Sequence, residues 1–175
     1  MHAKDIALIA LLLAAGTVLQ YLLSMLNLAL IPDVITAFYC LAIIRFGMKI
    51  HEAAVIGLFG GVLSMLIPGS VFPAGNLVSG PAGAVACYYC HELLRDRKTL
   101  SPLTATFLAT LISGCTFVAI ATFFVPATIL VLFGTFNAFV LAYLPVIIGT
   151  AVLNAVIVEI LVLLFPTGAA VQSPA

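Results

Sequence analysis

The sequence predicts an all-α integral membrane protein with six membrane-spanning helices and both termini on the cytoplasmic side. Of its 175 residues, 65% are hydrophobic and 7% are charged, and the mean hydropathy is +1.34. A soluble domain usually has about a quarter of its residues charged. Six spans of about 20 residues leave only short connections. We therefore expect a single membrane domain over residues 1–175, surrounded by membrane lipid.

The distribution of basic residues predicts the orientation. If the apolar runs form six helices, every Lys and Arg falls at one face of the membrane. They are Lys4 before the first run, Arg45 and Lys49 after the second, and Arg95, Arg97 and Lys98 after the fourth. The connections near 27–32, 68–76 and 126–138 contain neither residue type. Because cytoplasmic loops collect Lys and Arg, both termini are predicted to be cytoplasmic.

The first three helices are delimited by turn residues. The first apolar run predicts a helix over about 5–26, ending near Asn27. Pro32 and Asp33 open a second helix that ends at Arg45, and a third covers about 51–67. The stretch 68–76 is rich in Pro and Gly, which predicts an irregular loop at the outer face.

Prolines mark the ends of the remaining helices. A fourth helix is predicted to begin between 76 and 81 and to end within 92–98 at the inner face. The fifth runs from near Pro102 to Val125 and stops at Pro126. The sixth is expected to begin at about 142–145 and to reach Phe165, where Pro166 ends it.

Two polar positions lie midway along predicted helices: Ser113 in the fifth and Asn154 in the sixth. A polar side chain in hydrocarbon costs free energy unless it meets a partner or water. Each residue therefore either joins helices by a hydrogen bond or contacts a ligand, and the sequence leaves both roles open. Glu159 lies nearer the inner face. A position at the interface or against a partner is favoured over proton transfer, since the predicted bundle offers no relay partner.

Asp33 is the only charged residue predicted at the outer face. It could cap the second helix, or it could offer a counter-charge to a cationic ligand group, and the two roles are compatible. Gly75 and Asn76 lead into the fourth helix, and the amide groups of a helix N-terminus suit a carboxylate. A carboxylate and an anion-accepting helix start on one face would fit a zwitterion.

Several function classes lack the residues that they need. The sequence has no G-x-x-x-x-G-K loop, so we expect no ATPase activity in this chain. No basic stripe suggests a nucleic-acid partner. Cys87-x-x-Cys90-His91 matches a haem-attachment motif, but it leads into the basic inner face, so we expect no cofactor or metal. The ionisable residues are not predicted to lie together at one depth in the membrane, as an active site would require, so we do not expect this chain to be an enzyme.

Small residues recur at four-residue spacing on two predicted helices. Ala10 and Ala14 lie on the first helix, and Ala53, Gly57 and Gly61 lie on the third. Such stripes let helices approach closely within a membrane. We expect the stripe on the third helix to pack the protein against itself.

These features together resemble the substrate-binding (S) component of an energy-coupling-factor (ECF) transporter. The resemblance covers about residues 4–165 and rests on six short helices, the Ala10-x-x-x-Ala14 pair and the Pro/Gly-rich outer loop. The local motifs are similar to those of the tryptophan-specific branch. They are Pro32-Asp33, Phe72-Pro-Ala-Gly75 followed by Asn76, Ser113-Gly114, and Ala151-Val-Leu-Asn154. After Gly75 this chain has only a short segment before Pro81, where the branch carries a longer polar one.

The resemblance implies a substrate-capture subunit in the cell membrane. Such a subunit binds its ligand, here tryptophan, from outside and is driven by a transmembrane coupling subunit and two ABC ATPases that use ATP. Ala10 and Ala14 would form the surface that docks on the coupling subunit. The alternatives are an S component for another small nutrient, such as a vitamin or its precursor, and a structural membrane subunit that transports nothing.

Together with the polar residues, the resemblance predicts a binding site between the 68–80 loop and the second, fifth and sixth helices. Its expected ligand contacts are Asp33 to the ammonium, amides around Gly75 and Asn76 to the carboxylate, Asn154 or Ser113 to the indole N–H, and Phe72 as an aromatic wall.

Overall fold

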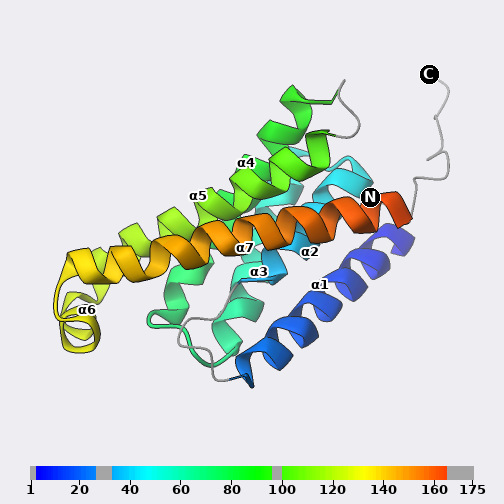
Figure 1. Cartoon of the computed structure of the whole chain (residues 1–175). Coiled ribbons are helices and arrows are strands. Elements are labelled where there is room, and N and C mark those ends of the chain that lie inside the picture. The colour runs from blue at the N-terminus through cyan, green and yellow to red at the C-terminus, as the bar shows by residue number, and fades with distance from the viewer. Residues whose placement is uncertain (1–2, 27–32, 96–99, 165–175) are drawn as a thin grey trace, which may run out of the picture.

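The computed structural model describes residues 3–26, 33–95 and 100–164, and in this part of the chain all regular structure is helical (Figure 1). The elements are α1 (Ala3–Ser24), α2 (Ile35–Phe46), α3 (Ile50–Leu66), the 3₁₀ helix η1 (Pro73–Gly75), α4 (Asn76–Leu93), α5 (Leu100–Phe124), α6 (Pro126–Phe133) and α7 (Phe136–Leu164). The predicted all-α class is confirmed. The connection 27–32, Arg97, Lys98 and the predicted helix end at Phe165 and Pro166 lie outside the described residues.

Three of the described helices are long and apolar enough to cross a membrane by themselves. They are α1, α5 and α7, with 22, 25 and 29 residues. Two shorter apolar helices, α2 with 12 residues and α3 with 17, accompany them. An α-helix needs about 20 residues to span a bilayer without help from its neighbours. The helix lengths thus support a membrane protein.

The predicted outer loop over 126–138 is wrong, because most of it is helical. Pro126 begins α6, and Gly134, with φ of 75°, ends it. A proline is pre-organised for the first helical position and only glycine adopts this φ readily, so both residues are ordinary helix-boundary signals. α7 begins at Phe136 rather than near 142–145, and Pro145 lies inside it. Proline is tolerated inside membrane helices because neighbouring groups satisfy the backbone that it frees.

Glycines bring α3 and α4 into direct backbone contact. A Cβ atom at Gly57 would lie 2.7 Å from the carbonyl oxygen of Gly80, and one at Gly61 would collide with the carbonyl oxygen of Asn76. The stripe predicted on the third helix therefore packs the protein against itself, as expected. This close approach fixes the start of α4, and with it Asn76, against the end of α3.

The short helix α2 lies in the middle of the bundle. Its side chains Ile35, Tyr39 and Ile43 are fully buried, and it contacts α1, α3, α4, α5 and α7. In Figure 1, α7 passes in front of α2, α1 lies below it, and α4 and α5 lie above it. Since a buried helix cannot adjust its position freely, Asp33, which lies two residues before its start, is placed by the surrounding helices.

The two ends of the bundle differ in charge. One end of the bundle, which we call the basic end, contains the start of α1, the α2–α3 turn, the end of α4 and the end of α7 (Figure 1). Of the described residues, Lys4, Arg45, Lys49 and Arg95 belong to these segments. The connection 67–72, η1 and α6 lie at the opposite end, where the described residues include no Lys or Arg.

Candidate substrate-binding pocket

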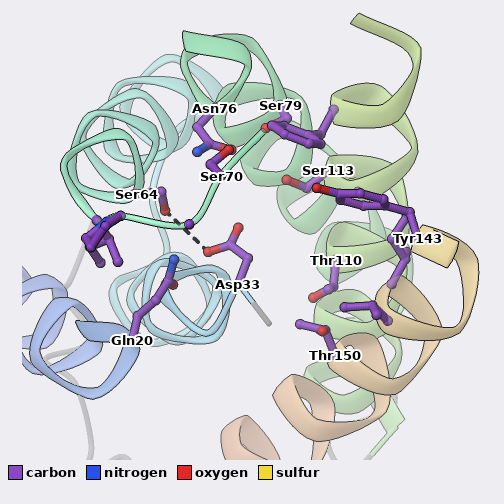
Figure 2. Close-up of a pocket in the computed structure, with 17 residues that line it drawn as sticks. Gln20, Asp33, Ser64, Ser70, Asn76, Ser79, Thr110, Ser113, Tyr143 and Thr150 are labelled. Carbon is purple, nitrogen blue, oxygen red and sulfur yellow. Dashed lines mark hydrogen bonds between the residues drawn. The ribbon is translucent and has the colours of Figure 1, made fainter. Parts of the chain in front are cut away.

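A pocket opens within the bundle toward the end opposite the basic one (Figure 2). Side chains of α1, α3, α4, α5 and α7 line it, together with Asp33 and the connection 67–70. The space between these groups, including the open mouth, amounts to about 790 Å³. The loop and the fifth and sixth predicted helices contribute as expected, α1 and α3 are additions, and the second predicted helix contributes only Asp33 at its start.

Asp33 is the only charged side chain among the described residues that line this pocket. Its carboxylate accepts hydrogen bonds from the hydroxyl of Thr36 at 2.8 Å and from the hydroxyl of Ser64 at 3.3 Å. The backbone N–H groups of Ile35 and Thr36 also donate to it, so all of its partners are neutral. A half-buried carboxylate that is held only by neutral groups favours the approach of a cation, because the attraction is strong where water is excluded.

The predicted role of Asp33 as a cap of α2 is confirmed. Val34 already has helical dihedral angles, with φ of −82° and ψ of −20°, and the Asp33 carboxylate accepts hydrogen bonds from the backbone N–H groups of Ile35 and Thr36. Gln20 of α1 also accepts a hydrogen bond from the backbone N–H of Ile35, at 3.0 Å. An amide from a neighbouring helix thus helps to satisfy the first turn of α2. The Asp33 carboxylate lies at the pocket as well, and Figure 2 shows it pointing into the cavity.

Asn154 lies behind the pocket rather than in its lining. It is fully buried, and its Nδ2 donates to the backbone oxygen of Asp33 at 2.8 Å and to Thr110 Oγ1 at 3.2 Å. Of the two roles left open by the sequence, the structure shows the one that joins helices: Asn154 ties α7 to α5 and to the segment before α2. Its side chain therefore holds Asp33 in place.

The backbone amides of Gly75 and Asn76 are not available to a carboxylate, so this part of the predicted site is wrong. The Gly75 N–H donates to the oxygen of Phe72 at 3.0 Å, and the Asn76 N–H bonds to the oxygens of Pro73 and Ala74. The reason is that η1 runs directly into α4 and leaves no open first turn. Asn76 lines the pocket all the same, and Figure 2 shows its side chain there.

The aromatic wall is formed by Phe117 and Tyr143, not by Phe72 as predicted. Their rings stack with centroids 6.0 Å apart, and both line the pocket. Phe72 stacks on Phe124 instead, with centroids 6.1 Å apart. A Cβ at Gly75 would lie 3.2 Å from the ring of Phe117. The Phe72–Gly75 motif thus supports the wall from behind.

Ser113 lines the pocket as expected, but most of its polar lining was not anticipated. The additional polar side chains come from six segments and are Gln20, Ser64, Ser70, Ser79, Thr110 and Thr150. Gln20 is the most informative omission, because an amide inside an otherwise apolar helix is costly unless it is bonded. That signal was present in the sequence.

Ala10 and Ala14 lie on the outside of the bundle. Both are exposed, and they line an apolar groove between α1 and α3 together with Ile6, Val55 and Phe59. His51 and Glu52 stand at the basic end of this groove. The two alanines do not pack against the described part of the chain, which leaves their small-residue face open to another helix or to lipid.

A family model described as "Tryptophan transporter TrpP" matches residues 2–168. No curated protein and no solved structure matches the chain. The matched range includes every residue that the structure describes, and so it includes both the pocket and the groove.

Proposed function

The chain belongs to the TrpP tryptophan transporter family, and from this premise we propose that it is the substrate-capture subunit of an energy-coupling-factor importer, with tryptophan as its ligand. Membership makes it a membrane transport protein rather than an enzyme. The observation that supports capture of an amino acid is the lone Asp33 carboxylate among neutral hydrogen-bonding groups, facing an aromatic wall.

In the proposed complex the ligand spans the pocket from its polar to its aromatic side. Asp33 binds the ammonium group, and the side chain of Asn76 donates to the carboxylate. The indole ring packs against Phe117 and Tyr143, an arrangement worth about 0.5–1.5 kcal/mol per aromatic pair beyond area burial. The hydroxyl of Ser113 accepts the indole N–H, so that of the two residues expected for this contact Ser113 is chosen and Asn154 is not.

We also propose that α1–α5 and α7 cross the membrane and that both termini are cytoplasmic. The positions of Lys4, Arg45, Lys49 and Arg95 at one end of the bundle support this orientation. The pocket then opens to the outside. The short helix α2 is surrounded by longer ones, and Gln20 of α1 accepts a hydrogen bond from the Ile35 N–H at its start.

Cysteine labelling is expected to report this orientation in a variant without the native cysteines. Gly69→Cys and Thr135→Cys should react with a membrane-impermeant maleimide on intact cells, because both lie at the pocket end. Lys49→Cys and Arg95→Cys should react only after the membrane is opened. Labelling of the second pair on intact cells would contradict the proposed orientation.

Transport in this proposal needs partners that supply energy. A helix of the coupling subunit occupies the groove beside Ala10 and Ala14, and two ABC ATPases bind and hydrolyse ATP. The small side chains let a partner helix approach closely. The groove is lined almost wholly by apolar side chains, as expected of a surface that pairs with another helix inside the bilayer.

Tryptophan binding by the wild-type chain tests the proposed function. The protein purified in detergent should bind tryptophan in isothermal calorimetry, and mass spectrometry should identify tryptophan as the ligand retained through purification. We expect weaker binding of tryptamine and of indole-3-propionate, since each lacks one charged group. Retention of another nutrient without tryptophan binding would contradict the substrate assignment and favour a different S component.

A further inference from the structure

Gln20 occupies an unusual position for an amide side chain. It lies on α1, is 6% exposed, and lines the pocket beside Asp33. Its Oε1 accepts the backbone N–H of Ile35 at 3.0 Å. Only the oxygen of an amide can accept this bond, so the contact fixes which end of the side chain is the nitrogen.

The nitrogen of Gln20 is therefore oriented by the fold. The hydrogen bond of the Gln20 side chain to the described residues is the one made by Oε1, and in Figure 2 the nitrogen points toward the cavity on the side of Asp33. An amide nitrogen carries two N–H donors. The pocket thus presents an acceptor, Asp33, and a donor, Gln20, next to each other.

This pairing matches the α-carbon substituents of an amino acid. The ammonium and the carboxylate of a zwitterion are attached to the same carbon, so a site must hold an acceptor and a donor close together. Among the described lining residues no Lys, Arg or His is present. The carboxylate must therefore be met by neutral donors. Asn76 and Gln20 both line the pocket with amide groups, and the amide of Gln20 is held in a fixed direction by its bond to Ile35.

We propose that Gln20 donates a hydrogen bond to the carboxylate of the bound amino acid while its oxygen holds the start of α2. The inference rests on the proposed function and adds a binding residue to it. Gln20 is the only described lining residue that α1 contributes. The ligand thus contacts directly the helix that carries Ala10 and Ala14.

The test compares two ligands that differ only in the carboxylate, tryptophan and tryptamine. Gln20→Met removes the amide oxygen and the amide nitrogen while keeping a side chain of similar length. Loss of the bond to Ile35 affects the two ligands alike, whereas loss of the donor affects tryptophan alone. We expect the ratio of tryptophan to tryptamine affinity, measured by calorimetry on the full chain, to fall by at least about tenfold relative to wild type.

A second variant keeps the test valid if Gln20→Met does not fold. Gln20→Glu retains an oxygen for the Ile35 N–H and, at pH 8, replaces the donor by a negative oxygen. It should lower the same ratio. An unchanged ratio in the folded variant would overturn this inference alone, even if both affinities fell. Absence of tryptophan binding by the wild type would overturn the proposed function and this inference with it.

Discussion

Replacing Asp33 by Asn is expected to raise the dissociation constant of tryptophan by at least about tenfold without unfolding the protein. The carboxylate is the only charged side chain among the described lining residues. Its contact with an ammonium is charge-assisted and worth about 1.5–3 kcal/mol, which corresponds to roughly 10–150-fold in affinity. The Asn side chain keeps one oxygen to accept from Thr36 or Ser64, so the local structure should persist.

Ligand analogues test whether Asp33 contacts the ammonium group in particular. In calorimetry, Asp33→Asn should weaken tryptophan and tryptamine, which carry the ammonium, but not indole-3-propionate, which lacks it. Glu92→Gln is a matched control, because Glu92 is an exposed carboxylate of α4 paired with Arg95 and remote from the pocket. Unaltered tryptophan affinity in Asp33→Asn would remove this residue from the site.

Asn154→Ala is a companion variant with the same expected direction and a different cause. It removes the 2.8 Å hydrogen bond to the backbone oxygen of Asp33 and the bond to Thr110. Asp33 would then lose the support that aims its carboxylate at the cavity. Tryptophan affinity should again fall by about tenfold or more, while unaltered affinity would show that Asp33 is held well enough by α1 and α3.

The helices could be predicted from the sequence because hydropathy and turn residues act locally. The ends of α2, α3 and α5 fall within one or two residues of the predicted ones. α6 was missed although Pro126 and Gly134 bracket it, because a run of about eight residues is too short to register as a span. The number of spans could not be confirmed from the helices alone, since α2 is shorter than a bilayer is thick.

The pocket was only partly predictable, for a physical reason. Asp33, Asn76 and Ser113 stand out as polar residues near helix ends or at depth, and all three line the cavity. Which face a membrane helix turns inward depends on packing, because lipid and protein interior are similarly apolar. The sequence therefore did not show that Tyr143 faces the pocket while Phe72 turns toward Phe124.

A double substitution at the groove is expected to abolish transport while leaving ligand binding intact. Ala10→Trp combined with Ala14→Trp would place two large rings on the exposed face of α1, where a partner helix needs close approach. The pocket should be unaffected, because Gln20 faces it from the opposite end of α1. Tryptophan uptake by cells and co-purification of the coupling subunit with its ATPases should both be lost.

The matched control separates docking from a general effect of bulky residues on α1. Leu8→Trp combined with Ala15→Trp alters two exposed positions outside the groove lining, and uptake should then stay near the wild-type rate. Calorimetry of both double variants should give unchanged tryptophan affinity, which shows that the fold and the pocket are preserved. If uptake continued at the wild-type rate in the Ala10→Trp and Ala14→Trp variant, the groove would not be the coupling surface. Loss of uptake in the control as well would mean that α1 meets its partner through a wider surface than the two alanines define.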